Sequence, residues 1–364
     1  MKVVCVVAKG LVFGTEATSP EAVEAIVRRR RSTPGQIGSS ANMIDALQQA
    51  GIVSQSETWR FWRWPSHVID VPGTRPWHVF QLGPDGSSPD LAAYVRTNGQ
   101  PDVIWVEGRS FQPELARVFD LCPSSFKIIY PQDWKPWRAE GLGRYDLCLV
   151  DDEAQAARMR KQQPGLRCAV WDKFVDYEQS HYPLGCRKEY DLCYVAYPSR
   201  RKNHELLFRA MAKLAERRLS CVCVGGRRKD NRAELERLGA ELGVRVHFTG
   251  EARKTEVNEW VNKSRIGVVC SKRDSAPRVL LEYMAADVPV LVNAELRAGL
   301  RYVGPEAGLV CPPEEFHLGI AQLLDHLDAY SPRAYLLEHY SREQVVARFA
   351  GILESAGLEV GLPT

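Results

Sequence analysis

Short apolar runs alternate with amphipathic segments through the second half of the chain. The runs predict buried strands at residues 192–196, 221–224, 244–248, 266–270 and 288–292. Between them the pattern is helical, as in residues 203–217, where Leu206, Leu207, Ala210, Met211 and Leu214 fall on one face. Strands that alternate with helices in this way predict a parallel, doubly wound α/β sheet.

The first half carries a similar set of apolar runs. They predict strands at residues 3–7, 101–107, 126–130, 146–150 and 168–171. The stretch 177–188 has no clear period and contains Pro183 and Gly185, which predicts a linker. We therefore expect domains at 1–176 and 189–340, a linker at 177–188, and a C-terminal segment at 341–364 that holds a helix at 341–355.

Two carboxylates follow the strand at 266–270. Asp274 lies in a polar loop, and Glu282 lies in a helix predicted at 276–286, with seven residues between them. In an open α/β sheet, ligands bind beyond the carboxyl ends of the strands, where the N–H groups of helix N-termini face anions. The loop therefore predicts a ligand site, with an ordinary β-loop-α-β unit bearing solvated acids as the alternative reading.

This stretch resembles the acidic-x7-acidic signature of family-4 retaining glycosyltransferases. The matching positions are Ser271, Asp274, Pro277, Leu280, Leu281, Glu282, Met284, Ala285, Pro289 and Val290. Asp274 stands where the family has Glu, and Ser275 and Asp287 stand where it has Gly. An Asp at a helix end tolerates the left-handed conformation. The resemblance covers residues 190–350 most strongly.

The resemblance implies the GT-B fold, with two Rossmann-like domains facing a cleft and a C-terminal helix that crosses back to the N-terminal domain. It implies that Asp274 holds hydroxyls of the donor sugar and Glu282 those of the ribose. Lys202, with Arg201 or Arg200 beside it, would neutralise the donor diphosphate. The further donor-side residues that it implies are Ser275, Ala276, Arg278, Val279, Gly250 and Arg253.

In the first half, the resemblance is carried by two shorter motifs. Gly35 and Gly38 lie in a loop like the one that approaches the donor phosphates and the acceptor. Gln132 and Asp133 follow the strand at 126–130, where many relatives have a His-Asp pair beside the reacting sugar. Gln132 donates hydrogen bonds but does not shuttle protons, and a helix cap is the alternative role for Asp133.

Composition narrows the class of protein. The chain has 364 residues, 45% of them hydrophobic, and a net charge of +3, which implies no broad attraction to nucleic acid or membranes. Its ten cysteines form no C-x-x-C pair and mostly fall in strand-like runs, so free thiols are favoured over disulfides or zinc. The N-terminus reads as a strand rather than a signal peptide, and no apolar run approaches eighteen residues. We expect a soluble, cytoplasmic protein.

Aromatic and basic residues are interleaved in the first half, at residues 59–64, 75–77 and 134–138. Exposed tryptophans stack on sugars and nucleobases alike, and buried ones belong to a core. The run Arg28–Arg31 has two alternative roles. It binds phosphates, or it interacts favourably with the negative end of a helix dipole. These features keep a non-catalytic nucleic-acid-binding module open as an alternative.

Together these patterns predict a hexosyltransferase that moves a sugar from a nucleoside-diphosphate sugar, with a UDP-sugar as the expected donor, to an acceptor hydroxyl. Retention is implied by the resemblance. We expect no cofactor and no metal, because no Asp-x-Asp motif is placed to hold one on the diphosphate. The acceptor is left open between a glycan, a lipid-linked sugar, a small molecule and a modified base in DNA. A sugar-nucleotide epimerase of the same fold is a further alternative.

Overall fold

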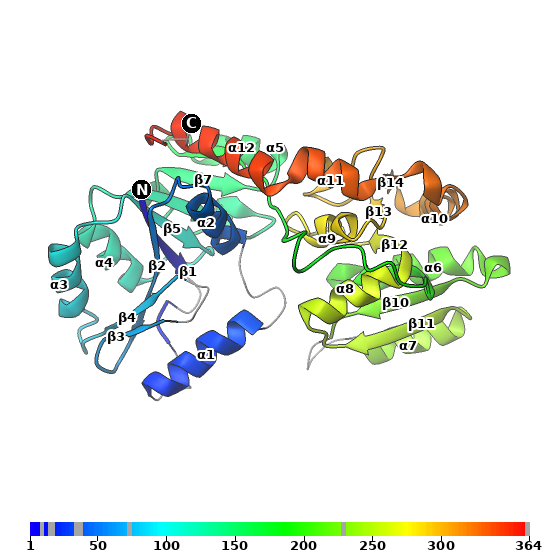
Figure 1. Ribbon diagram of the computed structural model, residues 1–364, viewed down its shortest axis with the longest axis horizontal. Coiled ribbons are helices and arrows are strands. Elements are labelled where there is room, and N and C mark those ends of the chain that lie inside the picture. The colour runs from blue at the N-terminus through cyan, green and yellow to red at the C-terminus, as the bar shows by residue number, and fades with distance from the viewer. Residues whose placement is uncertain (8–10, 14–18, 33–38, 71–74, 227–230, 361–364) are drawn as a thin grey trace. The chain divides into compact units, whose positions relative to one another are not determined.

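The chain divides into two compact units in the computed structural model (Figure 1). Unit 1 comprises Met1–Asp172 and Val346–Thr364, and unit 2 comprises Lys173–Val345. The structure describes residues 1–7, 11–13, 19–32, 39–70, 75–226 and 231–360. Gly35 and Gly38 lie outside the described residues, as do the side chains of Arg28–Arg31.

Unit 1 is built on an eight-stranded sheet in the order β3-β4-β2-β1-β5-β6-β7-β8. Every pairing is parallel except that of β3 with β4. The strands are β1 (Lys2–Val7), β2 (Gln55–Trp62), β3 (His67–Ile69), β4 (Trp77–Gln81), β5 (Val103–Glu107), β6 (Phe126–Tyr130), β7 (Leu147–Val150) and β8 (Arg167–Val170).

Helices cover this sheet, and each buries an apolar stripe. One core joins the strands to α3, α4 and α5 through side chains such as Leu91, Leu115 and Met159. A smaller core joins α1 to β2 and β4 through Val23, Val27 and their neighbours. The helices are α1 (Pro20–Ser32), α2 (Ser39–Gln49), α3 (Pro89–Asn98), α4 (Pro113–Leu121) and α5 (Glu153–Gln162), with short 3₁₀ turns η1 (Pro136–Arg138) and η2 (Leu142–Arg144).

The aromatic and basic stretch at 59–64 is mostly core rather than a stacking surface. It belongs to β2, in which Trp59 and Trp62 are buried and Arg60 is buried beneath the ring of Trp77. Of the tryptophans in the three interleaved stretches, only Trp64 is exposed. The rings of Trp59 and Trp62 are therefore used in packing and are not available to stack on a nucleic acid.

The C-terminal helix α12 (Arg342–Ser355) passes from unit 2 into unit 1, whose second segment begins at Val346. Within unit 1, its Phe349 stacks on Trp105 of β5 with ring centroids 5.1 Å apart. Trp171 packs edge-on against both rings. The crossing helix implied by the GT-B resemblance is thus confirmed, and an aromatic cluster anchors it.

Unit 2 contains a six-stranded, wholly parallel sheet in the order β11-β10-β9-β12-β13-β14. The predicted parallel, doubly wound arrangement is confirmed here. The strands are β9 (Tyr190–Val195), β10 (Ser220–Val224), β11 (Arg245–Gly250), β12 (Ser264–Val269), β13 (Val290–Asn293) and β14 (Gly308–Cys311).

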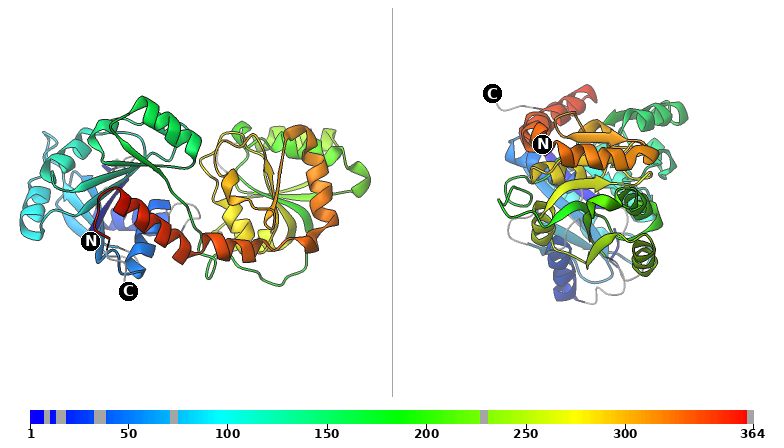
Figure 2. Two further views of the ribbon diagram at one scale, coloured as in Figure 1. Left: turned by 90° about the horizontal axis from the view of Figure 1, so that it is seen from above. Right: turned by 90° about the vertical axis from the view of Figure 1, so that its right-hand side faces the viewer.

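Helices lie on both faces of this sheet (Figure 2). One core contains apolar side chains of α8, α9 and α11, and the other those of α6, α7 and α10. The helices are α6 (His204–Ala212), α7 (Arg232–Glu241), α8 (Lys254–Asn262), α9 (Val279–Ala285), α10 (Phe316–Asp325) and α11 (Pro332–Tyr340). The 3₁₀ turns are η3 (Arg200–Lys202), η4 (Ala215–Arg217), η5 (Leu300–Tyr302), η6 (Pro313–Glu315) and η7 (Leu327–Ala329).

Helix α9 begins three residues later than the sequence pattern predicts. Ala276 has a positive φ of 38°, which is incompatible with a right-handed helix, and Pro277 has no N–H to donate. The helix ends at Ala285, one residue before the predicted end, and Asp287 follows in the left-handed conformation with φ of 59°.

The stretch 177–188 is hydrogen-bonded to α8 of unit 2. Asn258 of α8 accepts a hydrogen bond from the Tyr182 N–H at 3.3 Å, and Asn262 accepts one from the Leu184 N–H at 2.7 Å. Both asparagine side chains are buried, so these contacts satisfy polar groups that would otherwise be costly to bury. This stretch therefore lies along α8 and is held there by hydrogen bonds.

All ten cysteines are free thiols, and seven of them are buried, five of these in strands. Burial raises the pKa of the Cys5 thiol to about 11, which keeps it protonated and unreactive. None of the helices in the described part of the chain has both the length and the apolarity needed to cross a membrane.

Candidate active site

Two charged side chains meet at the carboxyl edge of the sheet in unit 2. Lys202 lies in η3, which follows β9, and Asp274 lies in the loop that follows β12. Strands β9 and β12 are hydrogen-bonded neighbours and run parallel, so their following loops emerge side by side. The Lys202 ammonium donates a hydrogen bond to Oδ2 of Asp274 and forms an ion pair with it.

Two hydrogen bonds hold the turn that carries Lys202 in place. Tyr194 of β9 donates its hydroxyl proton to the Lys202 carbonyl at 2.6 Å. Asn203 adopts a left-handed conformation, with φ of 55°, and its side-chain amide donates to the Cys270 carbonyl at 3.3 Å. These bonds tie the loop after β9 to the end of β12 and hold the Lys202 side chain near Asp274.

The Asp274 carboxylate is mostly buried and is held ionised. Burial by itself would raise its pKa, but the Lys202 ammonium, with Arg201 and the Ser275 N–H, outweighs this effect and lowers the pKa below 3.8. Ser271 donates its hydroxyl to Oδ2 at 3.4 Å, and the Ser275 N–H donates to Oδ1 at 3.1 Å. The carboxylate is therefore a fixed acceptor at neutral pH.

The two arginines before Lys202 point to different partners. Arg201 donates to the Tyr197 hydroxyl at 3.1 Å and contributes to the lowered pKa of Asp274. Arg200 is exposed, and its guanidinium lies 3.9 Å from a carboxylate oxygen of Glu234 on α7. Of the two, Arg201 has the geometry of a second cation beside Lys202.

Glu282 lies in the first turn of α9, with its side chain mostly buried. Nε2 of His181 lies 3.9 Å from its Oε1. The next residue, Tyr283, locks the helix to the sheet, because its hydroxyl donates to the Cys193 carbonyl at 3.1 Å and accepts from the Val195 N–H at 2.7 Å. Glu282 is thereby held near the carboxyl end of β9. Tyr283 was not a predicted site residue, since its place in an apolar helix pattern indicates only core.

The loop between Asp274 and α9 contains the predicted donor-side residues Ser275, Ala276 and Arg278, and Val279 is the first residue of α9. The carbonyls of Ser275 and Ala276 both accept hydrogen bonds from the buried ammonium of Lys173, at 2.8 and 3.2 Å. Lys173 was missed as a site residue. Its one signal is a lysine shortly after the last strand of the first half, which does not indicate burial.

Gly250 and Arg253 lie at the end of β11 and at the start of α8. Gly250 has φ of 77° and pairs with Gly225, so the two loops approach closely at this point. Arg253 is exposed and donates to Glu256 of the same helix at 2.7 Å. The structure thus shows Arg253 engaged in capping α8.

The unit 1 candidates Gln132 and Asp133 follow β6. Gln132 has φ of 55° and donates to the carboxylate of Glu107 at 2.6 Å. Asp133 accepts from Arg109 at 2.9 Å and from the Lys135 N–H at 2.9 Å. Asp133 therefore stabilises the turn before η1 and is also ion-paired.

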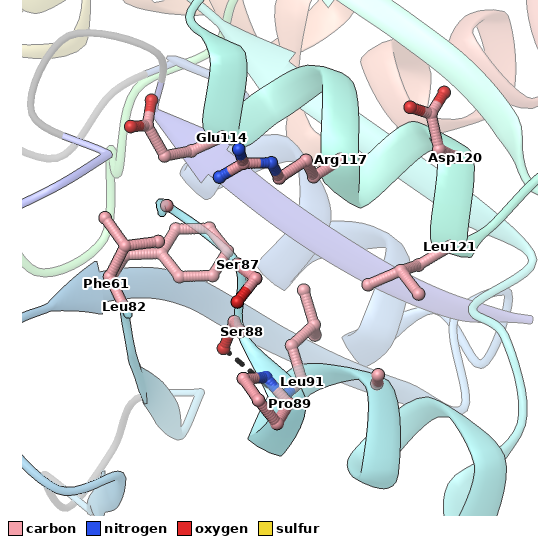
Figure 3. Close-up of a pocket in the computed structure, with 12 residues that line it drawn as sticks. Phe61, Leu82, Ser87, Ser88, Pro89, Leu91, Glu114, Arg117, Asp120 and Leu121 are labelled. Carbon is pink, nitrogen blue, oxygen red and sulfur yellow. Dashed lines mark hydrogen bonds between the residues drawn. The ribbon is translucent and has the colours of Figure 1, made fainter. Parts of the chain in front are cut away.

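A pocket of about 370 Å³ lies in unit 1, between α3 and α4 (Figure 3). Phe61, Leu82 and Leu91 form its apolar wall, and the guanidinium of Arg117 lies along it. The Ser88 hydroxyl in its wall accepts from the Leu91 N–H and caps α3. This pocket belongs to a different unit from Lys202 and Asp274 and contains no comparable pair of buried opposite charges.

Within the described residues, no three His, Cys, Asp or Glu side chains gather in a way that would hold a metal ion. The charges that gather around Asp274 include the ammonium of Lys202 and the guanidinium of Arg201. Cations beside hydroxyl-accepting carboxylates suit a ligand that has both an anionic group and hydroxyl groups.

The match to a family model agrees with this chemistry. Residues 180–334 match the model described as "Glycosyl transferases group 1", which covers nearly the whole of unit 2 and all of its predicted site residues, but not Lys173. No curated protein sequence gives a significant match.

Solved structures resemble the whole chain. Sucrose-phosphate synthase from Thermosynechococcus elongatus aligns with a TM-score of 0.65 at 18% identity, covering 98% of this chain and 99% of that one. Anabaena HepE in complex with UDP and glucose aligns with a TM-score of 0.66 at 14% identity, covering 98% and 100%. The lipopolysaccharide outer core galactosyltransferase WaaB aligns with a TM-score of 0.66 at 13% identity, covering 98% and 99%. At these identities the likeness shows the fold, which is GT-B.

Proposed function

We propose that this chain, which has the GT-B fold and matches the group 1 glycosyl transferase model at residues 180–334, transfers a hexose from a UDP-sugar to a hydroxyl of a sugar acceptor, with retention at the anomeric carbon. The observation that carries the proposal is the mostly buried Lys202–Asp274 ion pair at the carboxyl edge of the unit 2 sheet. The choice of UDP is supported by HepE, whose structures contain UDP and UDP-glucose.

In the proposed mechanism, the bond between the sugar and the diphosphate breaks, and one further negative charge develops on the terminal phosphate of the departing diphosphate. Lys202 and Arg201 lie where they stabilise that charge, and such stabilisation acts most strongly in the transition state. The bond between the acceptor oxygen and the anomeric carbon forms on the same face. The proton of the acceptor hydroxyl passes to the departing diphosphate.

The carboxylates take the neutral part of the donor. Asp274 is ionised, rigidly held and close to the cations, so it suits the role of accepting hydrogen bonds from sugar hydroxyls. Glu282, held near the end of β9 by Tyr283, suits the ribose hydroxyls. Lys202 would contact the diphosphate while Asp274 contacts the sugar. Because these two side chains are paired with each other, the sugar is held in a fixed position relative to its leaving group.

A sugar acceptor is favoured over DNA on two grounds. The net charge is only +3, and most of the interleaved tryptophans of unit 1 are used in packing. A modified DNA base would need exposed aromatic side chains to stack on after flipping. Gln132 and Asp133, at the carboxyl edge of the unit 1 sheet, are the proposed acceptor-side residues.

The test is a thermal-shift screen with UDP-, GDP-, ADP- and TDP-sugars, followed by product analysis with and without a panel of sugar acceptors. Ligands that bind the folded state raise the melting temperature, so a UDP-sugar should give the largest shift. A new glycoside with the donor's anomeric configuration is expected. Isomerisation of the donor alone would instead identify an epimerase, and inversion would contradict the retaining mechanism.

A further inference from the structure

Lys173 is a buried lysine whose ammonium hydrogen-bonds to two consecutive backbone carbonyls. Lys173 is only 4% exposed to solvent. Nζ donates to the carbonyl oxygen of Ser275 at 2.8 Å and to that of Ala276 at 3.2 Å. These two residues directly follow Asp274, in the loop that leads into α9. Lys173 therefore links the start of unit 2 to the loop that carries the proposed sugar-binding carboxylate.

The Lys173 backbone is fixed as well as its side chain. Its N–H donates to the hydroxyl of Tyr302 at 3.0 Å, and Tyr302 is itself completely buried. Burying an ammonium is costly unless it is hydrogen-bonded, so the two carbonyls offset a large part of that cost. A methyl group in place of the ammonium would leave both carbonyls without this donor.

These hydrogen bonds determine where the Ser275–Ala276 peptide group points. All described peptide bonds are trans, so the Ser275 C=O and the Ala276 N–H point in opposite directions. Because the C=O faces Lys173, the N–H faces away from it, and among the described residues no acceptor is found for this N–H. The donor N–H is thus presented on the side of the loop opposite to the buried lysine.

The loop conformation is strained and needs such support. Ala276 has φ of 38°, a left-handed conformation that costs a non-glycine residue about 1 kcal/mol or more. Gly299 packs against the same point, since a Cβ there would lie 3.1 Å from the Ala276 Cα. Lys173 and Gly299 together hold the loop in a conformation that Ala276 would not otherwise favour.

We propose that Lys173 is a positioning residue for sugar transfer: it holds the Ser275–Ala276 peptide so that the Ala276 N–H hydrogen-bonds to the sugar–diphosphate part of the donor. This inference rests on the proposed function, because the ligand is the nucleotide sugar. Lys173 does not itself touch the donor. It acts through the loop, and its buried positive charge also polarises the peptide group toward stronger donation.

The test compares Lys173→Met with Lys173→Arg and with a matched control, Lys188→Met. Lys188 also donates to a backbone carbonyl of unit 2, that of Asn262 at 2.9 Å, but it precedes β9 and so lies at the opposite edge of the sheet. Affinities for UDP and for UDP-glucose, kcat, and amide hydrogen exchange of residues 272–279 are measured for all three variants and the wild type.

Lys173→Met should lower kcat by about 10- to 100-fold, because small misplacements of a donor-positioning group have effects of that size. Affinity for UDP-glucose should fall more than affinity for UDP, and exchange should quicken in residues 272–279. Lys173→Arg keeps the charge and should recover part of kcat, while Lys188→Met should resemble the wild type in all four measurements.

Three outcomes would overturn the inference. These are unchanged kcat in a folded Lys173→Met variant, equal loss in the Lys188→Met control, or equal loss of UDP and UDP-glucose binding without faster exchange in the loop. If Lys173→Met fails to fold, the same comparison is made with Lys173→Arg. A wild-type protein that binds no nucleotide sugar would instead contradict the proposed function, so the two failures are distinguishable.

Discussion

The ammonium of Lys202 is hydrogen-bonded to the carboxylate of Asp274, 72 positions further along the chain. The two residues meet because β9 and β12 are adjacent parallel strands whose carboxyl ends lie at the same edge of the sheet. Their side chains are 15% and 14% exposed, so the pair is only partly screened by water. In the proposed function, the donor diphosphate shares this lysine with the aspartate.

Replacing Lys202 with Met should affect both stability and catalysis. The Asp274 carboxylate would lose its main partner, which costs about 1–3 kcal/mol for a mostly buried group. Loss of a cation at the leaving group should lower kcat by about 10²-fold or more. Urea unfolding and steady-state kinetics measure the two effects. The double variant with Asp274→Asn should regain much of the stability but none of the activity, and additive stability losses would contradict the pairing.

Arg200 and Arg201 provide a matched pair of substitutions. Arg201→Ala should lower kcat with UDP-glucose substantially, because Arg201 lies close enough to Asp274 to lower its pKa. Arg200→Ala should have little effect, since that side chain is exposed and lies near Glu234 on α7. Initial-rate measurements with UDP-glucose give the kcat of both variants for comparison. A larger loss in Arg200→Ala would reverse the assignment of the second cation.

Glu282→Ala should weaken binding of UDP while leaving the protein folded. Its proposed ribose contact lies in the nucleoside part of the donor, so UDP and UDP-glucose should lose affinity by the same factor. Asp274→Ala, by contrast, should chiefly lower turnover. Calorimetric titration with both ligands measures this, with Glu241→Ala on the exposed end of α7 as the control. Unchanged UDP affinity in Glu282→Ala would exclude the ribose role.

The lowered pKa of Asp274 predicts a specific loss of stability in acid. A folded-state pKa below the unfolded value of 3.8 means that ionised Asp274 stabilises the fold above that pH, and that this contribution disappears as the pH falls through the folded pKa. Wild-type protein should therefore lose unfolding free energy more steeply than Asp274→Asn below about pH 4. Parallel slopes in urea titrations at several pH values would contradict the ionised pair.

In unit 2 the apolar runs predict five of the six strands and miss β14. The strands β10, β12 and β13 are almost wholly buried, whereas β11 is only partly buried, and the strand order places the loops that carry residues 202 and 274 side by side. Asp287, at the end of α9, adopts the left-handed conformation that its residue type favours. What the pattern could not give is the start of α9, because the positive φ of Ala276 depends on distant contacts with Lys173 and Gly299.

In unit 1 the sequence was harder to interpret because charges occur inside a buried strand. Glu57 of β2 is completely buried, and its carboxylate accepts from Trp59 at 2.9 Å and from the Tyr94 hydroxyl at 2.8 Å. Burial would raise its pKa, yet these hydrogen bonds and Lys2 hold the pKa below its usual value. Such satisfied polar groups make a core strand look like a surface. The glycine loop with Gly35 and Gly38 lies outside the described residues and stays a prediction.

The most direct test of the central claim is calorimetric titration of the wild type and of Lys202→Met with UDP-glucose. The wild type should bind with one site per chain, and the variant, while still folded, should lose affinity by about 10-fold or more because the diphosphate has lost a charge-assisted hydrogen bond. Equal affinity in the two proteins would contradict a diphosphate site at Lys202 and Asp274.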